Sequence, residues 1–275
     1  VEPTLPWPDF QGIVDLDRVV LAHETELVGM TGRVQVLDDH MTRLVLNGKL
    51  DGHSTFALDL EEVAENVREL KVTAQDAGLT AKGLDLFTKG AGGSLELNAQ
   101  IRGRQDDVEI DGLATMEGFR LTEAPVFARL LSTASLSGIA DLARDGRIEF
   151  RRAEVPFTLR EGIFDIDDAS ANGPALGLTM SGQFVQSLKE ANLRGVIVPA
   201  YGFNSLIGRV PIIGDIITGG ENEGLIAINY GITGPLTDPE LSVNPASMLA
   251  PGILRKIFST GKGKVSVPDE PASLD

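Results

Sequence analysis

The side chains in this sequence best suited to metal or acid–base chemistry are three histidines. His23, His40 and His53 lie 17 and 13 residues apart in a strand-and-turn context, without the His-Glu-x-x-His spacing that puts two imidazoles on one helix face. They would form a metal site, or the centre of an enzyme, only if the fold brought them together. Solvated histidines on separate strands and turns are the simpler interpretation, so we expect no metal site.

Two acidic segments resemble calcium ligands. Residues 107–112 begin like a calcium loop, with acids at alternate positions followed by glycine. The twelfth position of such a loop needs a bidentate glutamate, and here it is Gly118. Asp165, Asp167 and Asp168 lie in a similar setting beside a strand. We interpret both segments as the solvent-facing sides of strands, because carboxylates are rarely buried without a partner.

Motifs for phosphate binding or nucleophilic catalysis are absent from the sequence. The glycine-rich residues 90–95 lack the last glycine of a dinucleotide fingerprint and precede a strand pattern where the motif requires a helix. The sequence has no Gly-x-Ser-x-Gly elbow and no P-loop. Its lack of cysteine also excludes disulfides, thiolate metal sites and cysteine nucleophiles. We therefore expect no enzyme activity, no catalytic residues and no cofactor.

The composition excludes further classes of protein. The 275 residues are 42% hydrophobic, which is enough for a folded core. A net charge of −16 argues against a general nucleic-acid binder, because affinity for phosphate backbones comes from Lys and Arg. The sequence contains no run of about 18 apolar residues, the length that a membrane-spanning helix needs. The sequence starts without Met, signal peptide or anchor, so we expect a piece of a longer protein whose targeting signals lie upstream.

The elements that would have to position any site are mostly β-strands. Apolar and polar residues alternate over short runs that end in Gly, Asn or Asp, for example in residues 12–19, 43–50, 94–101, 147–159 and 225–232. Glycine recurs near the centres or ends of these runs and indicates bends and twist. The pattern predicts a mainly β fold: a long, curved antiparallel sheet that forms an open groove or a partial barrel.

Turns and a few short helices complete this plan. Asn47-Gly48, Asp51-Gly52, Asp111-Gly112, Asp145-Gly146 and Asn172-Gly173 are pairs typical of hairpin turns. Short capping helices are predicted over residues 76–87, 124–131, 136–143 and 251–258, with helical turns within 201–218.

Alternation would put one row of apolar side chains on a single face of the sheet. The helices predicted are too few to cover that face, which favours an apolar trough over an ordinary two-layer core. The residues expected to line it are Ile148, Phe150, Val155, Phe157, Leu159, Phe164, Ile166, Leu176, Leu178 and Met180.

Charge is distributed unevenly along the chain. Residues 1–190 carry 18 basic and 32 acidic side chains, whereas residues 191–275 carry 6 and 8. Within the second part, residues 245–267 contain four basic residues and no acid. This stretch would either contact a membrane surface or plug the end of the trough, two alternatives that remain open. The side chains expected to face the membrane are Ile253, Leu254, Arg255, Lys256, Ile257 and Phe258.

Several segments of the second half resemble the AsmA-like superfamily, most closely the C-terminal region of its YhdP branch, whose relatives include TamB. The matching segments are residues 198–204 (Val-Pro-Ala-Tyr-Gly-Phe-Asn), 210–214, 218–225, 232–239 (Ile-Thr-Gly-Pro-Leu-Thr-Asp-Pro) and 243–245, with the helix pair at 124–143 and the strand start at 146–150. The resemblance spans about residues 65 to 258. It implies periplasmic proteins of Gram-negative bacteria, held in the inner membrane by an N-terminal helix, whose strands form a groove similar to that of bridge-like lipid transfer proteins.

On this basis we expect three parts: residues 1–64 as a strand-repeat segment continuing an upstream β-groove, residues 65–258 as an AsmA-like C-terminal domain, and residues 259–275 as a disordered tail. The main hypothesis is a periplasmic conduit segment that carries phospholipid acyl chains between the inner and outer membranes. Its expected partners are phospholipids, a membrane surface and an envelope protein, without nucleic acid. The alternative hypothesis is an envelope scaffold that docks a protein partner and transports nothing.

Overall fold

The computed structural model describes residues 8–38, 40–104, 107–122, 125–133, 148–199 and 227–246. These residues form one 14-stranded antiparallel sheet with two short α-helices. The first half of the sheet contains β1 (Phe10–Val20), β2 (Glu26–Leu37), β3 (His40–Leu50), β4 (Ser54–Ala64), β5 (Val67–Ala74), β6 (Gly90–Ala91) and β7 (Ser94–Arg102). The second half contains β8 (Glu109–Leu121), β9 (Ile148–Arg160), β10 (Ile163–Asn172), β11 (Leu176–Val185), β12 (Glu190–Pro199), β13 (Ala227–Pro235) and β14 (Glu240–Ala246).

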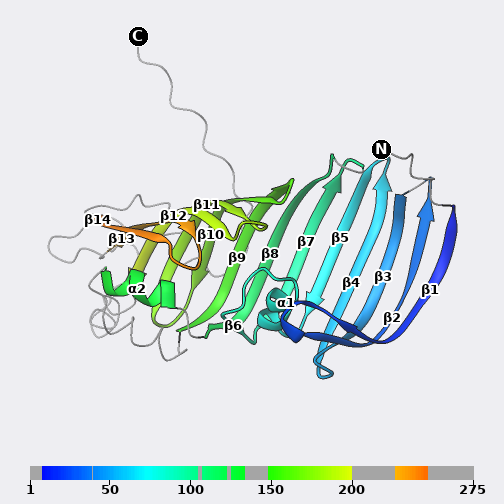
Figure 1. Cartoon of the computed structure of the whole chain (residues 1–275), viewed down its shortest axis with the longest axis horizontal. Coiled ribbons are helices and arrows are strands. Elements are labelled where there is room, and N and C mark those ends of the chain that lie inside the picture. The colour runs from blue at the N-terminus through cyan, green and yellow to red at the C-terminus, as the bar shows by residue number, and fades with distance from the viewer. Residues whose placement is uncertain are drawn as a thin grey trace, which may run out of the picture.

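The strands follow one another across the sheet in chain order, as Figure 1 shows, and only the short β6 lies off this path, paired with β8. The sheet is open, with β1 at one edge and β14 at the other. The predicted fold class, a long curved antiparallel sheet with a few short helices, is therefore confirmed. The expected boundary at residue 64 falls in the turn between β4 and β5, and these two strands pair directly.

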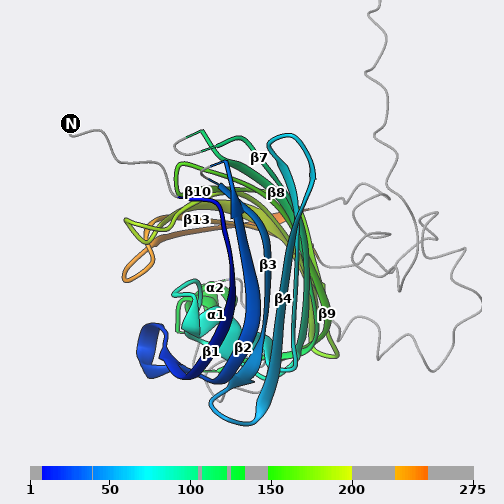
Figure 2. The same ribbon diagram turned by 90° about the vertical axis from the view of Figure 1, so that its right-hand side faces the viewer.

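The sheet curves into a trough, and both helices lie on its concave side (Figure 2). Irregular pairing contributes to the curvature, with register shifts between Val28 and Thr31 in β2 and between Ile166 and Ala169 in β10. Such bulges bend a strand and increase its local twist. The 3-10 helix Ala22–Glu24 connects β1 to β2.

Two predicted hairpin turns are wrong. Asn47-Gly48 lies inside β3 and Asp111-Gly112 lies inside β8. A Cβ atom on Gly112 would come within 2.6 Å of the Phe157 ring, and one on Gly48 would lie 3.0 Å from Leu27 Cδ1. These glycines make room for neighbouring side chains on the concave face, so they serve packing and not chain reversal.

The helices only partly follow the prediction. α1 spans Ala77–Gly83, shorter than the predicted 76–87, and begins where the Asp76 side chain accepts a 2.8 Å hydrogen bond from the Leu79 backbone N–H. Asp85, with a positive φ of 56°, prevents its continuation. α2 spans Pro125–Thr133 and agrees with the prediction for 124–131. The helices predicted within residues 136–143, 201–218 and 251–258 lie outside the described residues.

Two buried clusters hold the helices onto the sheet. Leu130 and Leu131 of α2 are fully buried, in a cluster with Ile148, Phe150 and Leu176. A smaller cluster joins Leu27, Met30, Leu50 and Ala74 to Leu79 of α1. These buried residues lie toward one end of the strands, the end where β5 leads into α1 and β8 leads into α2.

Candidate functional site

An unbroken apolar row crosses the concave face from one edge of the sheet to the other. We call it the concave row. It takes one residue from every strand on the pairing path, and each residue pairs directly with the next. Its members are Gly12, Val34, Leu44, Leu60, Leu70, Ala99, Gly112, Phe157, Ile166, Gly182, Leu193, Ile232 and Leu241.

Most of the concave row is only half-buried. Among its members only Leu60 and Ala99 are buried, with 7% and 8% of their surface exposed, and the others keep intermediate exposure. Apolar residues in a closed two-layer core would be covered on this side. Within the described part of the chain, α1 and α2 are the only α-helices over the concave face. The α2 cluster reaches Ile232 and Leu241 of the row, and the rest of the row lies beside the two clusters. The row is therefore partly open to solvent.

The residues predicted to line a trough all lie on the concave side, but their surroundings differ. Ile148, Phe150 and Leu176 are buried in the α2 cluster, and Leu178 packs against it. The others are half-buried and lie farther along the strands, namely Val155, Phe157, Leu159, Phe164, Ile166 and Met180. Their side chains are more accessible than those covered by α2.

Three phenyl rings extend this surface across neighbouring strands. The ring centroids of Phe157 and Phe164 are 5.6 Å apart, and those of Phe164 and Phe184 are 6.2 Å apart. Such tilted pairs stabilise a sheet beyond the area that they bury. Phe184 was missed by the sequence prediction, although it follows Met180 with the same period of two.

The first strands also contribute concave residues that the sequence prediction did not select. Leu46, Leu58, Val72 and Leu97 pair in succession on β3, β4, β5 and β7. Together with Leu44 and Leu70 of the concave row, they extend the apolar surface over β3, β4, β5 and β7. Alternation alone could have identified them, because each faces the same side as its neighbour two residues away.

The opposite, convex face is polar and has ion pairs between strands. Arg43 contacts Asp59 at 2.8 Å and Glu61 at 2.6 Å, and Arg152 contacts Glu117 at 2.6 Å. Such exposed pairs contribute little stability individually. Their main effect is to give the convex face hydrated, charged character.

The calcium-like segment belongs to this convex face. Glu109 bonds to Arg160 at 2.6 Å, and Asp111 accepts a 2.8 Å hydrogen bond from the Thr158 hydroxyl and also contacts Arg102. The Thr158 hydrogen bond, helped by the charge of Arg102, lowers the pKa of Asp111. The second acidic segment, with Asp165, Asp167 and Asp168, is exposed on β10.

Two polar contacts join the helices to turns of the later strands. Lys189, between β11 and β12, donates to the Asp85 carboxylate at 2.7 Å, and Asp85 also lies 2.7 Å from His23 Nε2. Arg129 of α2 contacts Asp238, between β13 and β14, at 3.0 Å. These two turns lie at the ends of the later strands opposite to the end where β8 leads into α2, so the curvature of the sheet brings them to the helix region on its concave side.

The three histidines have different partners. His23 bonds to Asp85, His40 lies 3.0 Å from Glu62, and His53 bonds to the backbone oxygen of Asp51. Among the described residues, no group of three or more potential ligands is arranged to hold a metal ion.

The residues expected to face a membrane, 253–258, lie outside the described residues. In the part of the chain that the structure describes, none of the helices combines the length and hydrophobicity that crossing a bilayer requires.

Comparison with known proteins gives no relative: no family model, no curated protein and no solved structure matches this chain.

Proposed function

We propose that this chain binds the acyl chains of phospholipids along the concave row and acts as a segment of a lipid conduit, without enzymatic activity. The observation that supports this most strongly is the row itself. Its side chains are all apolar, with glycine at Gly12, Gly112 and Gly182, and it crosses every long strand and stays half-exposed over most of its length. An exposed apolar surface of this extent marks an interaction site.

The dimensions of the row suit a hydrocarbon chain. Twelve inter-strand steps separate β1 from β14, and at about 4.8 Å per step the row measures roughly 58 Å along the sheet. This is close to twice the hydrocarbon thickness of a bilayer, about 30 Å. Each methylene transferred from water to the row contributes about 0.8 kcal/mol, so an acyl chain is held strongly without any polar contact.

The uniform chemistry of the row supports movement as well as binding. Successive members are Leu44, Leu60 and Leu70, with no charged group among them. A chain displaced by one strand meets similar contacts, so barriers between neighbouring positions are low. The charged convex face keeps the other side of the sheet hydrated.

The wider setting of the proposal comes from the sequence resemblance. We place the chain in the periplasm, as part of a longer protein held in the inner membrane, with phospholipids and a membrane surface as partners. Residues 253–258 would make the membrane contact.

The experiment that tests this proposal is lipid extraction from the purified chain. We expect phospholipid in stoichiometric amounts after purification without detergent. Protein that is folded and free of lipid, and that takes up none from vesicles, would contradict the proposal.

One observation favours the alternative, an envelope scaffold that carries no lipid. α2 fills part of the concave side, where Leu130, Leu131 and Ile148 are all fully buried. A scaffold would use its closed core for rigidity and dock a protein elsewhere. Deleting residues 251–264 discriminates between the two functions: vesicle flotation should fall if this segment contacts membrane, and stay unchanged if it docks a protein.

A further inference from the structure

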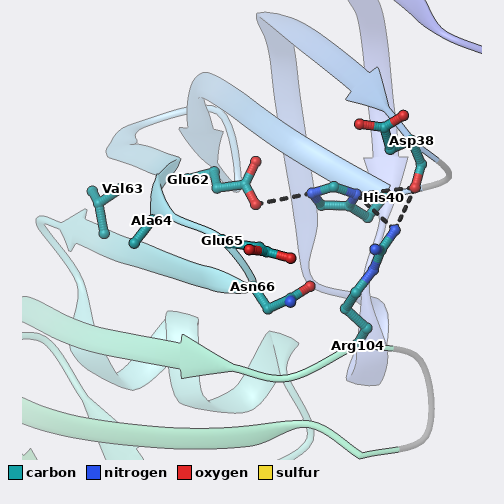
Figure 3. Close-up of a pocket in the computed structure, with 8 residues that line it drawn as sticks. All are labelled: Asp38, His40, Glu62, Val63, Ala64, Glu65, Asn66 and Arg104. Carbon is teal, nitrogen blue, oxygen red and sulfur yellow. Dashed lines mark hydrogen bonds and ion pairs between the residues drawn. The ribbon is translucent and has the colours of Figure 1, made fainter.

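A polar hollow of about 790 Å³ lies at the end of the strands away from α1 and α2. Three turns meet there: those between β2 and β3, β4 and β5, and β7 and β8. The polar side chains around it are Asp38, His40, Glu62, Glu65, Asn66 and Arg104, drawn in Figure 3. Both signs of charge occur in this hollow, close to the apolar face.

The contacts inside the hollow show which of its polar groups already have a hydrogen-bond partner. Arg104 Nη2 lies 3.1 Å from His40 Nδ1 and also contacts the backbone oxygen of Asp38. His40 Nδ1 also lies 3.2 Å from the Asp38 backbone oxygen, and its Nε2 lies 3.0 Å from the Glu62 carboxylate. His40 therefore links Arg104 to Glu62.

Two groups in the hollow retain bonding capacity. Both contacts of Arg104 use Nη2, which leaves the donors on Nε and Nη1 without a partner among the described residues. The Glu65 carboxylate likewise has no hydrogen bond or ion pair with the described part of the chain. An available guanidinium edge suits a phosphate, and an available carboxylate suits an ammonium group.

The hollow adjoins the concave row directly. On β4 and β5 the row is formed by the pair Leu60 and Leu70, and the next concave pair is Glu62 and Arg68. Within two residues along each strand, the concave face changes from apolar to charged. An amphiphile lying across this boundary would keep its hydrocarbon on the row and its polar end in the hollow.

We infer that the hollow binds a zwitterionic phospholipid headgroup carrying a phosphate and a primary ammonium, as in phosphoethanolamine. This inference rests on the proposed function, because the acyl chains of the same lipid occupy the concave row. Arg104 binds the phosphate, and Glu65 binds the ammonium. A headgroup with only negative charge is disfavoured, because Asp38, Glu62 and Glu65 outnumber the guanidinium of Arg104 in the lining together with that of Arg68 beside it.

The test uses the three histidines of the chain as reporters, since only His40 lines the hollow. Side-chain ¹H–¹³C spectra are recorded while the short-chain lipid dihexanoyl phosphatidylethanolamine is added. We expect saturable shifts of His40 and none of His23 or His53. Dihexanoyl phosphatidylglycerol and free phosphoethanolamine should each bind at least about tenfold more weakly, the first for its charge and the second because it lacks acyl chains.

Two variants test whether Glu65 binds the headgroup. Glu65→Gln should weaken the phosphatidylethanolamine response about tenfold, whereas Glu61→Gln, on the convex side of β4 and paired with Arg43, should leave it unchanged. Lipid uptake with His40 unaffected would overturn the headgroup assignment and leave the proposed function standing. Equal binding of free phosphoethanolamine would overturn the assignment to lipid. Failure to take up any lipid would overturn both.

Discussion

Introducing a charge into the concave row should remove lipid binding without unfolding the chain. Leu70 is the best position, because it lies in the middle of the row between Leu60 and Ala99 and is half-buried. We predict that Leu70→Asp loses bound phospholipid. Thr73→Asp is the control, since Thr73 is exposed on the convex side of the same strand. An aspartate there has the same low strand propensity and also faces Glu96 on β7, so this control disturbs the strand at least as much.

The magnitude follows from the half-burial of Leu70. Full burial of a leucine is worth about 1.5–3 kcal/mol, so losing this partly exposed side chain costs the fold about 1–2 kcal/mol. The new carboxylate stays hydrated in the lipid-free protein. Under an acyl chain it would lose that hydration, which costs several kcal/mol. At 1.4 kcal/mol per factor of ten, retention should fall by at least about a hundredfold.

Native mass spectrometry of the purified variants measures this directly. The unmodified chain and Thr73→Asp should carry phospholipid, Leu70→Asp should not, and circular dichroism should be the same for all three. Leu70→Ala should fall between them, because it removes contact area without adding charge. Equal lipid occupancy in Leu70→Asp and Thr73→Asp would refute the assignment of the concave row as the binding surface.

Three further predictions concern the helices and a buried phenol. Leu131→Ala should lower the free energy of unfolding in urea by about 2–5 kcal/mol, because Leu131 is fully buried; a loss below about 0.5 kcal/mol would contradict the packing of α2. Hydrogen bonds from Lys189 and then His23 lower the pKa of Asp85. The stability from these bonds is therefore present above the pKa of Asp85 in the unfolded chain and is lost as the pH falls through the lower pKa of the folded chain. A ¹³C carboxyl titration should show the Asp85 midpoint rising in Lys189→Ala, and an unchanged midpoint would argue against the contact. Burial raises the pKa of Tyr230, so the contribution of the buried phenol to stability is complete below the usual phenol pKa of about 10 and falls above it. The ultraviolet difference between the native chain and Tyr230→Phe should show no phenolate near that pH before unfolding. Ionisation of Tyr230 at the usual phenol pKa in the folded chain would contradict its burial.

The fold class could be predicted from the sequence because strand alternation is a local signal. Each run such as residues 43–50 shows its two faces without reference to the rest of the chain. The curvature was suggested by recurrent glycine. The role of each glycine was not predictable, since Gly48 and Gly112 are fixed by Leu27 and Phe157 from other strands.

The position of an apolar face on the sheet could be predicted from the sequence, but its extent could not. Alternation identified residues 155–166 as one apolar face, yet it could not tell that α2 would cover Ile148, Phe150 and Leu176, because that depends on where a helix docks. The hollow around His40 could not be foreseen either. Its side chains come from three turns whose proximity is set by the register of the intervening strands.

The most direct test of acyl-chain binding along the concave row is a paramagnetic measurement on methyl-labelled protein with a phospholipid that carries a nitroxide near the end of one acyl chain. We predict strong broadening of the methyl signals of Leu44, Leu70 and Ile166 on the concave row. Ile13 and Leu113, which are 85% and 42% exposed on the convex face, should keep their intensity. Equal broadening on both faces, or none on the concave row while lipid is bound, would contradict the claim that acyl chains lie along this row.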